Sequence, residues 1–174
     1  GKVDGLMVPF LLGLYAFGTG KAALMPFHRW LPTAMVAPTP VSALLHAVAI
    51  VKAGVFTVLK VIVYVFGIDF LTDTGANQWL MWVAAFSLIS SSIIACTKDN
   101  LKARLAYSTI SQLAYITLGA SIATAAAVQG AALHIAMHAV GKITLFFCAG
   151  AIYVALHKKK ISEMNGIGRK MPFT

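Results

Sequence analysis

Long apolar runs constrain this chain more than any other feature of its sequence. Hydrophobic residues make up 59% of its 174 residues and charged residues only 11%, whereas a soluble domain has about a quarter charged residues. A membrane helix needs about 20 mostly apolar residues. Four clean runs approach or exceed that length, at residues 41–67, 78–97, 105–123 and 128–156. We therefore expect an all-α, polytopic transmembrane helix bundle without a sheet.

The first 40 residues form a further membrane segment, which we expect to be discontinuous and followed by a Pro-rich stretch. The apolar run that begins near Leu6 is interrupted by Gly18, Gly20 and Lys21, and residues 26–40 contain four prolines. Glycine and proline free backbone groups from helical bonding, which a membrane tolerates only where protein or a cavity surrounds them. We expect helical bonding to stop between Gly18 and the first of these prolines, with Lys21 beside the break. The alternative is that Lys21 ends a short helix at the interface. With this segment, the bundle has about five membrane helices.

The connections between the apolar runs alternate in charge. The turn 98–104 and the tail 157–174 are rich in Lys and Arg, whereas the turn 69–77 has two aspartates and no basic residue. Under the positive-inside rule, the basic connections face the cytoplasm, so we expect the tail there. We expect residues 1–174 to form one membrane domain. Because the chain opens with Gly1 rather than Met, we expect it to be part of a longer subunit.

The charge balance excludes one class of partner. Fourteen Lys and Arg residues against five acids give a formal net charge of +9. They lie at the ends of apolar runs or alone inside them, rather than in a basic stripe with interleaved aromatic residues, so we expect a lipid bilayer and no nucleic acid as a partner. Cys96 and Cys148 lack the spacing of metal ligands, and we interpret them as packing residues. We expect no cofactor and no metal.

Ionisable residues inside the apolar segments are the strongest functional signal. A charge at mid-bilayer costs roughly 2.5–3.5 kcal/mol, so such groups persist where they face a wet or protein-lined interior. Imidazole both accepts and donates a proton near neutral pH. We therefore predict a proton relay on one internal polar band. Its residues are Lys21, His46, Lys52, His134, His138 and Lys142.

The spacing within the last run supports the relay. The positions of His134, His138 and Lys142 step by four, so the three side chains share one helix face. Two other interpretations stay open: HxxxH can bind zinc if a third ligand joins it, and a membrane histidine can hydrogen-bond a neighbouring helix. No carboxylate lies in any run, so we expect some of the basic groups to be neutral at pH 7. Lys60 is near the end of its run and can reach the interface.

Six stretches of the chain combine these residues into longer motifs. The first, KAALMPFHRWLP from Lys21 to Pro32, is a specific Pro/His/Trp signature. The others are residues 34–46, 51–54, 98–112, 134–142 and 164–172. Together they resemble the antiporter-like membrane subunits of respiratory complex I and of Mrp-type sodium/proton antiporters. The resemblance covers essentially the whole chain.

The resemblance implies a fold and positions for the site residues. Members of this family have about fourteen transmembrane helices in two inverted five-helix repeats, and conduct protons along a central hydrophilic axis. This chain is similar to the second repeat, half of such a subunit. Lys21 matches the lysine at the break of the seventh helix, while the other matches are His46 and Lys52 on the eighth and His134, His138 and Lys142 on the eleventh. The family's glutamate on the fifth helix and its Lys or Glu on the twelfth are absent here.

The expected function is proton translocation across a membrane. The resemblance implies a subunit of a complex-I-like NADH:quinone oxidoreductase or of an Mrp-type cation/proton antiporter, without a redox centre of its own. Its partners are then other membrane subunits and protons, with sodium as a second candidate ion. Its location is a bacterial inner membrane or a mitochondrial-type energy-transducing membrane. The alternatives are a membrane subunit of a membrane-bound hydrogenase or formate hydrogenlyase, and a structural membrane scaffold.

Overall fold

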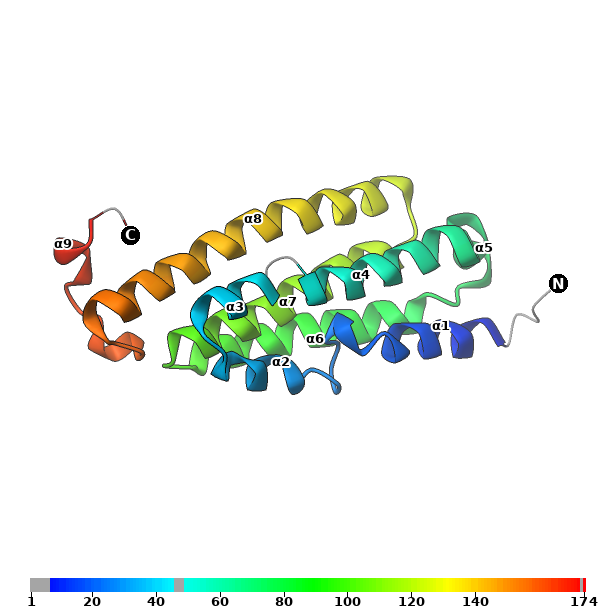
Figure 1. The fold of residues 1–174 in the computed structure, drawn as a ribbon. Coiled ribbons are helices and arrows are strands. Elements are labelled where there is room, and N and C mark those ends of the chain that lie inside the picture. Colours follow the sequence, from blue (N-terminus) through cyan, green and yellow to red (C-terminus); the bar gives the residue numbers. More distant parts are fainter. Residues whose placement is uncertain (1–6, 46–48, 173) are drawn as a thin grey trace.

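The fold is a layered bundle of helices (Figure 1). The computed structural model describes residues 7–45, 49–172 and 174, and within these ranges the helices are joined by turns, without a strand. Asn100 and Lys160 form one isolated bridge between extended segments. The predicted all-α class is confirmed.

The first segment breaks where glycine and proline predict it. Helix α1 (Met7–Gly18) ends before the short 3-10 turn η1 (Gly20–Ala22), which contains Lys21. Helical structure then resumes in short pieces: α2 (Trp30–Thr33), η2 (Ala34–Val36) and α3 (Thr39–Leu44). Regular helical bonding is therefore lost beside Lys21, as the sequence predicts.

The next segment differs from the expected single span and turn. After α3 comes α4 (Ile50–Lys60), which continues as a π-helix, η4 (Val61–Phe66), and then turns by 80° into α5 (Ile68–Thr74). Gly67 forms the corner with φ +83, a conformation that costs glycine little. Much of the connection predicted at 69–77 is therefore helical rather than an open turn.

Three long helices complete the bundle: α6 (Gln78–Thr97), α7 (Leu101–Ser121) and α8 (Ala125–Leu156). The Asn100 and Thr124 side chains each accept a hydrogen bond from a backbone N–H of the first turn of α7 and α8, respectively, which is a favourable N-cap arrangement. Two described helices, α6 and α8, are long and apolar enough to cross a membrane, and the bent pair formed by α4–η4 and α5 would be a third. The expected number of about five also relied on α1, which has 12 residues, and on α7, which begins with charged residues.

The core lies where η1, α1 and α4 pack against α7. Its fully buried side chains include Leu12, Val55, Ile110 and Leu113. A smaller apolar cluster joins α3 to α7 and α8 around Phe146. Large apolar side chains also remain exposed, with Trp82 77% and Met137 72% exposed. Exposed apolar surface of this extent is typical of contact with lipid or another protein.

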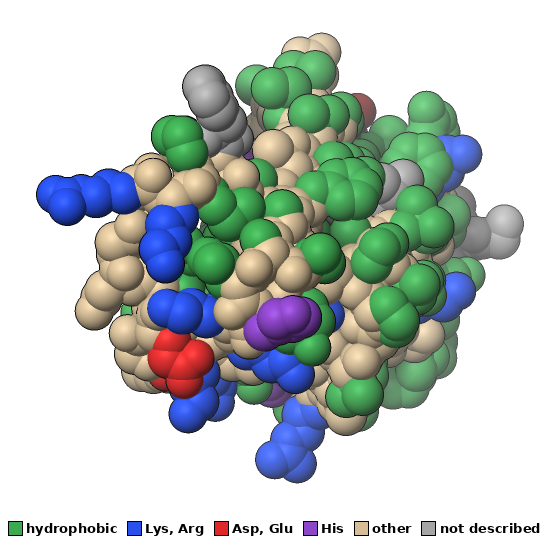
Figure 2. Space-filling view, turned by 60° about the vertical axis from the view of Figure 1, so that its left-hand side comes forward, with side chains coloured by type: hydrophobic (Ala, Val, Ile, Leu, Met, Phe, Trp, Pro, Cys, Tyr) green, Lys and Arg blue, Asp and Glu red, His purple; other side chains and the backbone are tan. Residues whose placement is uncertain are grey.

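The C-terminal tail is held against the link between α6 and α7. It contains η5 (Ile161–Glu163) and α9 (Ile167–Lys170). The Asp99 carboxylate accepts hydrogen bonds from the Ser162 backbone N–H at 3.0 Å and from the Ser162 hydroxyl at 2.8 Å. These bonds, with the backbone bond first, hold the pKa of Asp99 below its usual value. The two basic connections therefore meet at one end of the bundle, where Lys and Arg side chains gather around the rim (Figure 2).

Candidate functional site

Two lysines are buried between α4, α7 and α8. Lys52 on α4 is 7% exposed and Lys142 on α8 is 4% exposed, and they are the only charged side chains buried in the described part of the chain. Burial of a charged group is costly unless it finds partners. The partners of these lysines therefore define the candidate site.

Lys52 is hydrogen-bonded to a histidine of the facing helix. Its Nζ contacts Nδ1 of His138 on α8. When the lysine donates, Nδ1 of the neutral imidazole accepts, and the ring proton is then on Nε2. The Nε2 atom of His138 is buried and has no hydrogen-bond partner among the described residues. One end of this imidazole is thus bonded to a lysine, while the other end is free to bind water or a proton.

His134 extends the site by one helical turn. Its ring stacks on that of His138, with 5.9 Å between centroids and 11° between planes. Nε2 of His134 is 2.7 Å from Oε1 of Gln112 on α7. Because the amide oxygen accepts, this contact places a ring proton on Nε2 of His134. The Tyr115 ring lies on the same histidine, at 5.2 Å between centroids.

Lys142 is bonded to α7 rather than to α4. Its Nζ donates to the Leu105 carbonyl at 3.2 Å and to the Ser108 hydroxyl at 2.9 Å. On α8, Lys142 follows His138 by four residues, which is about 6 Å along the axis. The distance suits a bridging water between the two groups, provided polar partners surround it.

Small residues allow the helices around these groups to approach closely. A Cβ atom on Gly54, two residues after Lys52, would lie 2.5 Å from the carbonyl carbon of Lys21. On the other side of the site, a Cβ on Gly119 of α7 would lie 3.3 Å from the Ala131 side chain of α8. Small residues at helix contacts are typical of packing in membranes. The backbone of the break is therefore packed directly against the helix that carries Lys52.

The structure unites four of the six predicted relay residues. Lys52, His134 and His138 form one connected group, and Lys142 lies one turn further along α8. The side chain of Lys21 is exposed, although its backbone packs on α4. His46 lies outside the described residues.

The polar partners on α7 were missed in the sequence analysis. Ser108 and Gln112 are four residues apart, so they lie on one face of the helix, and each bonds a residue of the site. This spacing of four within an apolar run was a usable signal. Lys60, which was set apart, is exposed, with its Nζ 5.2 Å from the centroid of the Phe56 ring. In the described part of the chain, no three His, Cys, Asp or Glu residues are grouped to hold a metal.

The site is thus a chain of proton-accepting and proton-donating groups inside a helical bundle. Comparison with protein families matches residues 3–174 to the family described as NADH:quinone oxidoreductase/Mrp antiporter, TM. Subunit L of the F(420)H(2) dehydrogenase of Methanosarcina mazei is 37% identical over 172 residues, covering 94% of this chain and 24% of that protein. A probable K(+)/H(+) antiporter protein of Rhizobium meliloti, also named as a subunit, is 40% identical over 155 residues, covering 88% of this chain and 15% of that protein.

The structural comparison agrees with these sequence matches. In the solved Mrp complex from Dietzia sp. DQ12-45-1b, one chain is similar with a TM-score of 0.78 and 35% identity, covering 87% of this chain and 16% of that one. The chain therefore spans between 15% and 24% of the length of these relatives. The resemblance of the motifs is confirmed by sequence and by fold. The chain belongs to the transmembrane family of NADH:quinone oxidoreductase and Mrp antiporter subunits.

Proposed function

We propose that this chain conducts protons inside a membrane, and that Lys52, His134, His138 and Lys142 carry them. The observation that carries the proposal is the hydrogen bond between Lys52 and His138, formed between two helices in the apolar interior. A lysine and an imidazole can exchange a proton without a change in their total charge. Such an exchange needs no carboxylate and no cofactor.

The geometry supports a stepwise transfer. Protonated Lys52 gives its proton to Nδ1 of His138 and becomes a neutral amine. The resulting imidazolium releases the proton bound to Nε2, which is the buried atom without a partner, to a water. From there the proton reaches Lys142 after that group has given up its own. A second charge in the band is repelled by the first, so each arriving proton favours the departure of another.

Two further residues enter the proposal through their sequence positions. Lys21 lies at the break of the first segment, beside α4, where discontinuous helices of transporters form ion sites. His46 precedes Lys52 by six residues in the same apolar run. We assign both to the ends of the same path.

The relatives indicate the kind of assembly. One is named as part of a dehydrogenase and the other as part of an antiporter. We propose that this chain likewise works beside other membrane subunits in an energy-transducing membrane, with residues 157–174 on the cytoplasmic side. Protons are the proposed cargo and sodium is the second candidate. The dehydrogenase relative favours a redox-linked pump as the alternative to an antiporter.

Replacing Lys142 with Met in the complete protein tests the proposal. Methionine preserves much of the side-chain volume but cannot carry a proton, so proton pumping into sealed vesicles should fall at least tenfold, on the order of a lost acid–base group. Assembly, measured as the yield of intact complex, should stay unchanged. Lys60→Met is the control, because that lysine is exposed and outside the band. Undiminished pumping in Lys142→Met would leave only a scaffold role for these groups.

A further inference from the structure

A groove of about 900 Å³ lies away from the proton-carrying residues, at the end of the bundle that carries the basic connections. Three segments form it: Pro32–Pro40 of the broken region, Asn100–Ala103 at the start of α7, and the last two turns of α8 with Lys158 and Lys159. A Cβ on Gly150 of α8 would lie 2.9 Å from the Thr39 side chain. The groove thus begins where α3 and α8 pack most closely.

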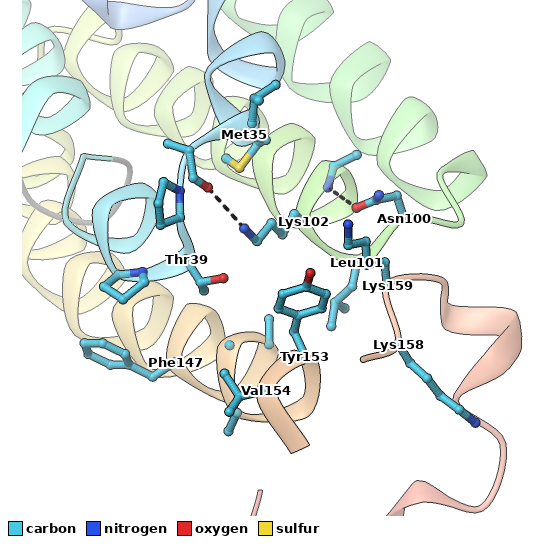
Figure 3. Close-up of a pocket in the computed structure, with 18 of the residues that line it drawn as sticks. Met35, Thr39, Asn100, Leu101, Lys102, Phe147, Tyr153, Val154, Lys158 and Lys159 are labelled. Carbon is cyan, nitrogen blue, oxygen red and sulfur yellow. Dashed lines mark hydrogen bonds between the residues drawn. The ribbon is translucent and has the colours of Figure 1, made fainter. Parts of the chain in front are cut away.

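The long walls of the groove are apolar and open to the surroundings. Val36 is 92% exposed and Val154 is 74% exposed, and the Phe147 ring also lines the groove and is exposed. These residues come from different segments but border one space (Figure 3). In a membrane protein, an open apolar channel of this kind suits a hydrocarbon chain better than water.

One end of the groove is basic. Three of the described residues that line it are lysines and none is acidic. The Lys102 ammonium enters the groove and donates to the Ala37 carbonyl at 3.2 Å. The Lys159 ammonium lies 5.1 Å from the centroid of the Tyr153 ring. Figure 3 shows Lys102, Tyr153 and Lys159 close together, while the Lys158 side chain points away from them.

An apolar channel that ends in ammonium groups matches one class of molecule. Lysine binds phosphate as a point charge, and basic pockets between membrane helices on the cytoplasmic side bind anionic lipid headgroups. We propose that this groove binds an anionic phospholipid. Its acyl chain lies along Val36, Phe147 and Val154, and its phosphate is held between Lys102 and Lys159. Neither lysine belongs to the proton band, so this proposal stands or falls apart from the proposed function.

Native mass spectrometry of the complete complex tests the site. The delipidated complex is titrated with dioleoylphosphatidylglycerol and with dioleoylphosphatidylcholine, which has the same acyl chains but no net charge. We expect the anionic lipid to bind more tightly by about 20-fold, the effect of two lysines near a charged headgroup. The double variant Lys102→Gln/Lys159→Gln should lose this preference. The control Lys60→Gln/Lys170→Gln removes the same charge outside the groove and should keep it.

A second variant tests the apolar part without touching the lysines. Val154→Trp places an indole in the mouth of the groove, so it should weaken binding of the anionic lipid about tenfold while the complex assembles normally. Equal retention of the two lipids, retention of neither, or an unchanged preference in Lys102→Gln/Lys159→Gln would overturn the proposal. Displacement of the lipid by millimolar inorganic phosphate alone would also overturn it, because the groove would then be a phosphate site.

Discussion

At the scale of single residues, the two ring nitrogens of His138 have different surroundings. One is bonded to Lys52 and the other is buried without a partner in the described part of the chain. A purely structural histidine would need only the first contact, because that contact satisfies the lysine. A relay histidine needs both nitrogens, because a proton enters at one and leaves from the other.

The variant His138→Gln separates these two roles. Glutamine can still accept a hydrogen bond from Lys52, but it cannot take up a proton. We therefore expect the complete protein to assemble normally and to lose proton pumping in vesicles at least tenfold. His157→Gln is the matched control, since His157 is exposed at the end of α8. Pumping that survives in His138→Gln would assign this histidine to structure alone.

At the scale of elements, the contact between α4 and η1 depends on the absence of one side chain. A methyl group on Gly54 would lie within 2.6 Å of the Ala22 backbone nitrogen and still closer to Lys21. Gly54→Ala should therefore force the break away from α4, with a cost of about 1–3 kcal/mol in the free energy of unfolding. Thermal unfolding of the complete protein in detergent measures the change. Gly130→Ala is the control, because nothing described lies within 4 Å of its added Cβ, and equal stability of the two variants would contradict the close packing.

The elements also show how far the sequence could lead. The break at Lys21 was predictable, because glycines and prolines act on the backbone locally. The stripe from His134 to Lys142 was predictable from helical spacing alone. The bend after η4 was not, since its run of β-branched and aromatic residues is as apolar as a straight span. Pairing of Lys52 with His138 depends on which helix faces meet, which is decided by packing between segments distant in the sequence.

At the scale of the whole molecule, the tail and the link between α6 and α7 form one unit through Asp99. Its carboxylate is bonded to Ser162, and these bonds hold its pKa below the usual value. The stabilisation of the tail is therefore complete above the unfolded-state pKa, about 3.9, and is lost as the pH falls through the lower folded-state value.

Hydrogen exchange of residues 161–163, corrected for intrinsic rates, measures this effect. Protection should be high at pH 7 and should decline below about pH 4, the range in which the unfolded carboxyl group titrates. The variant Asp99→Asn should show weaker protection at pH 7 and little dependence on acid. Asp73→Asn, at an exposed position in α5, should behave like the unmodified protein. A decline at low pH that persists in Asp99→Asn would assign the effect to another group.

The length and direction of α8 have an electrical consequence. His134 and Lys142 are eight residues apart, which corresponds to about 12 Å along the helix axis. The hydrocarbon core of a bilayer is about 30 Å thick. With α8 upright, a proton that moves between these two residues would cross about two-fifths of the membrane voltage, or about 1 kcal/mol per 100 mV. The occupancy of Lys142 would then respond to the membrane potential as well as to pH, and an energised membrane would bias the direction in which the band is filled.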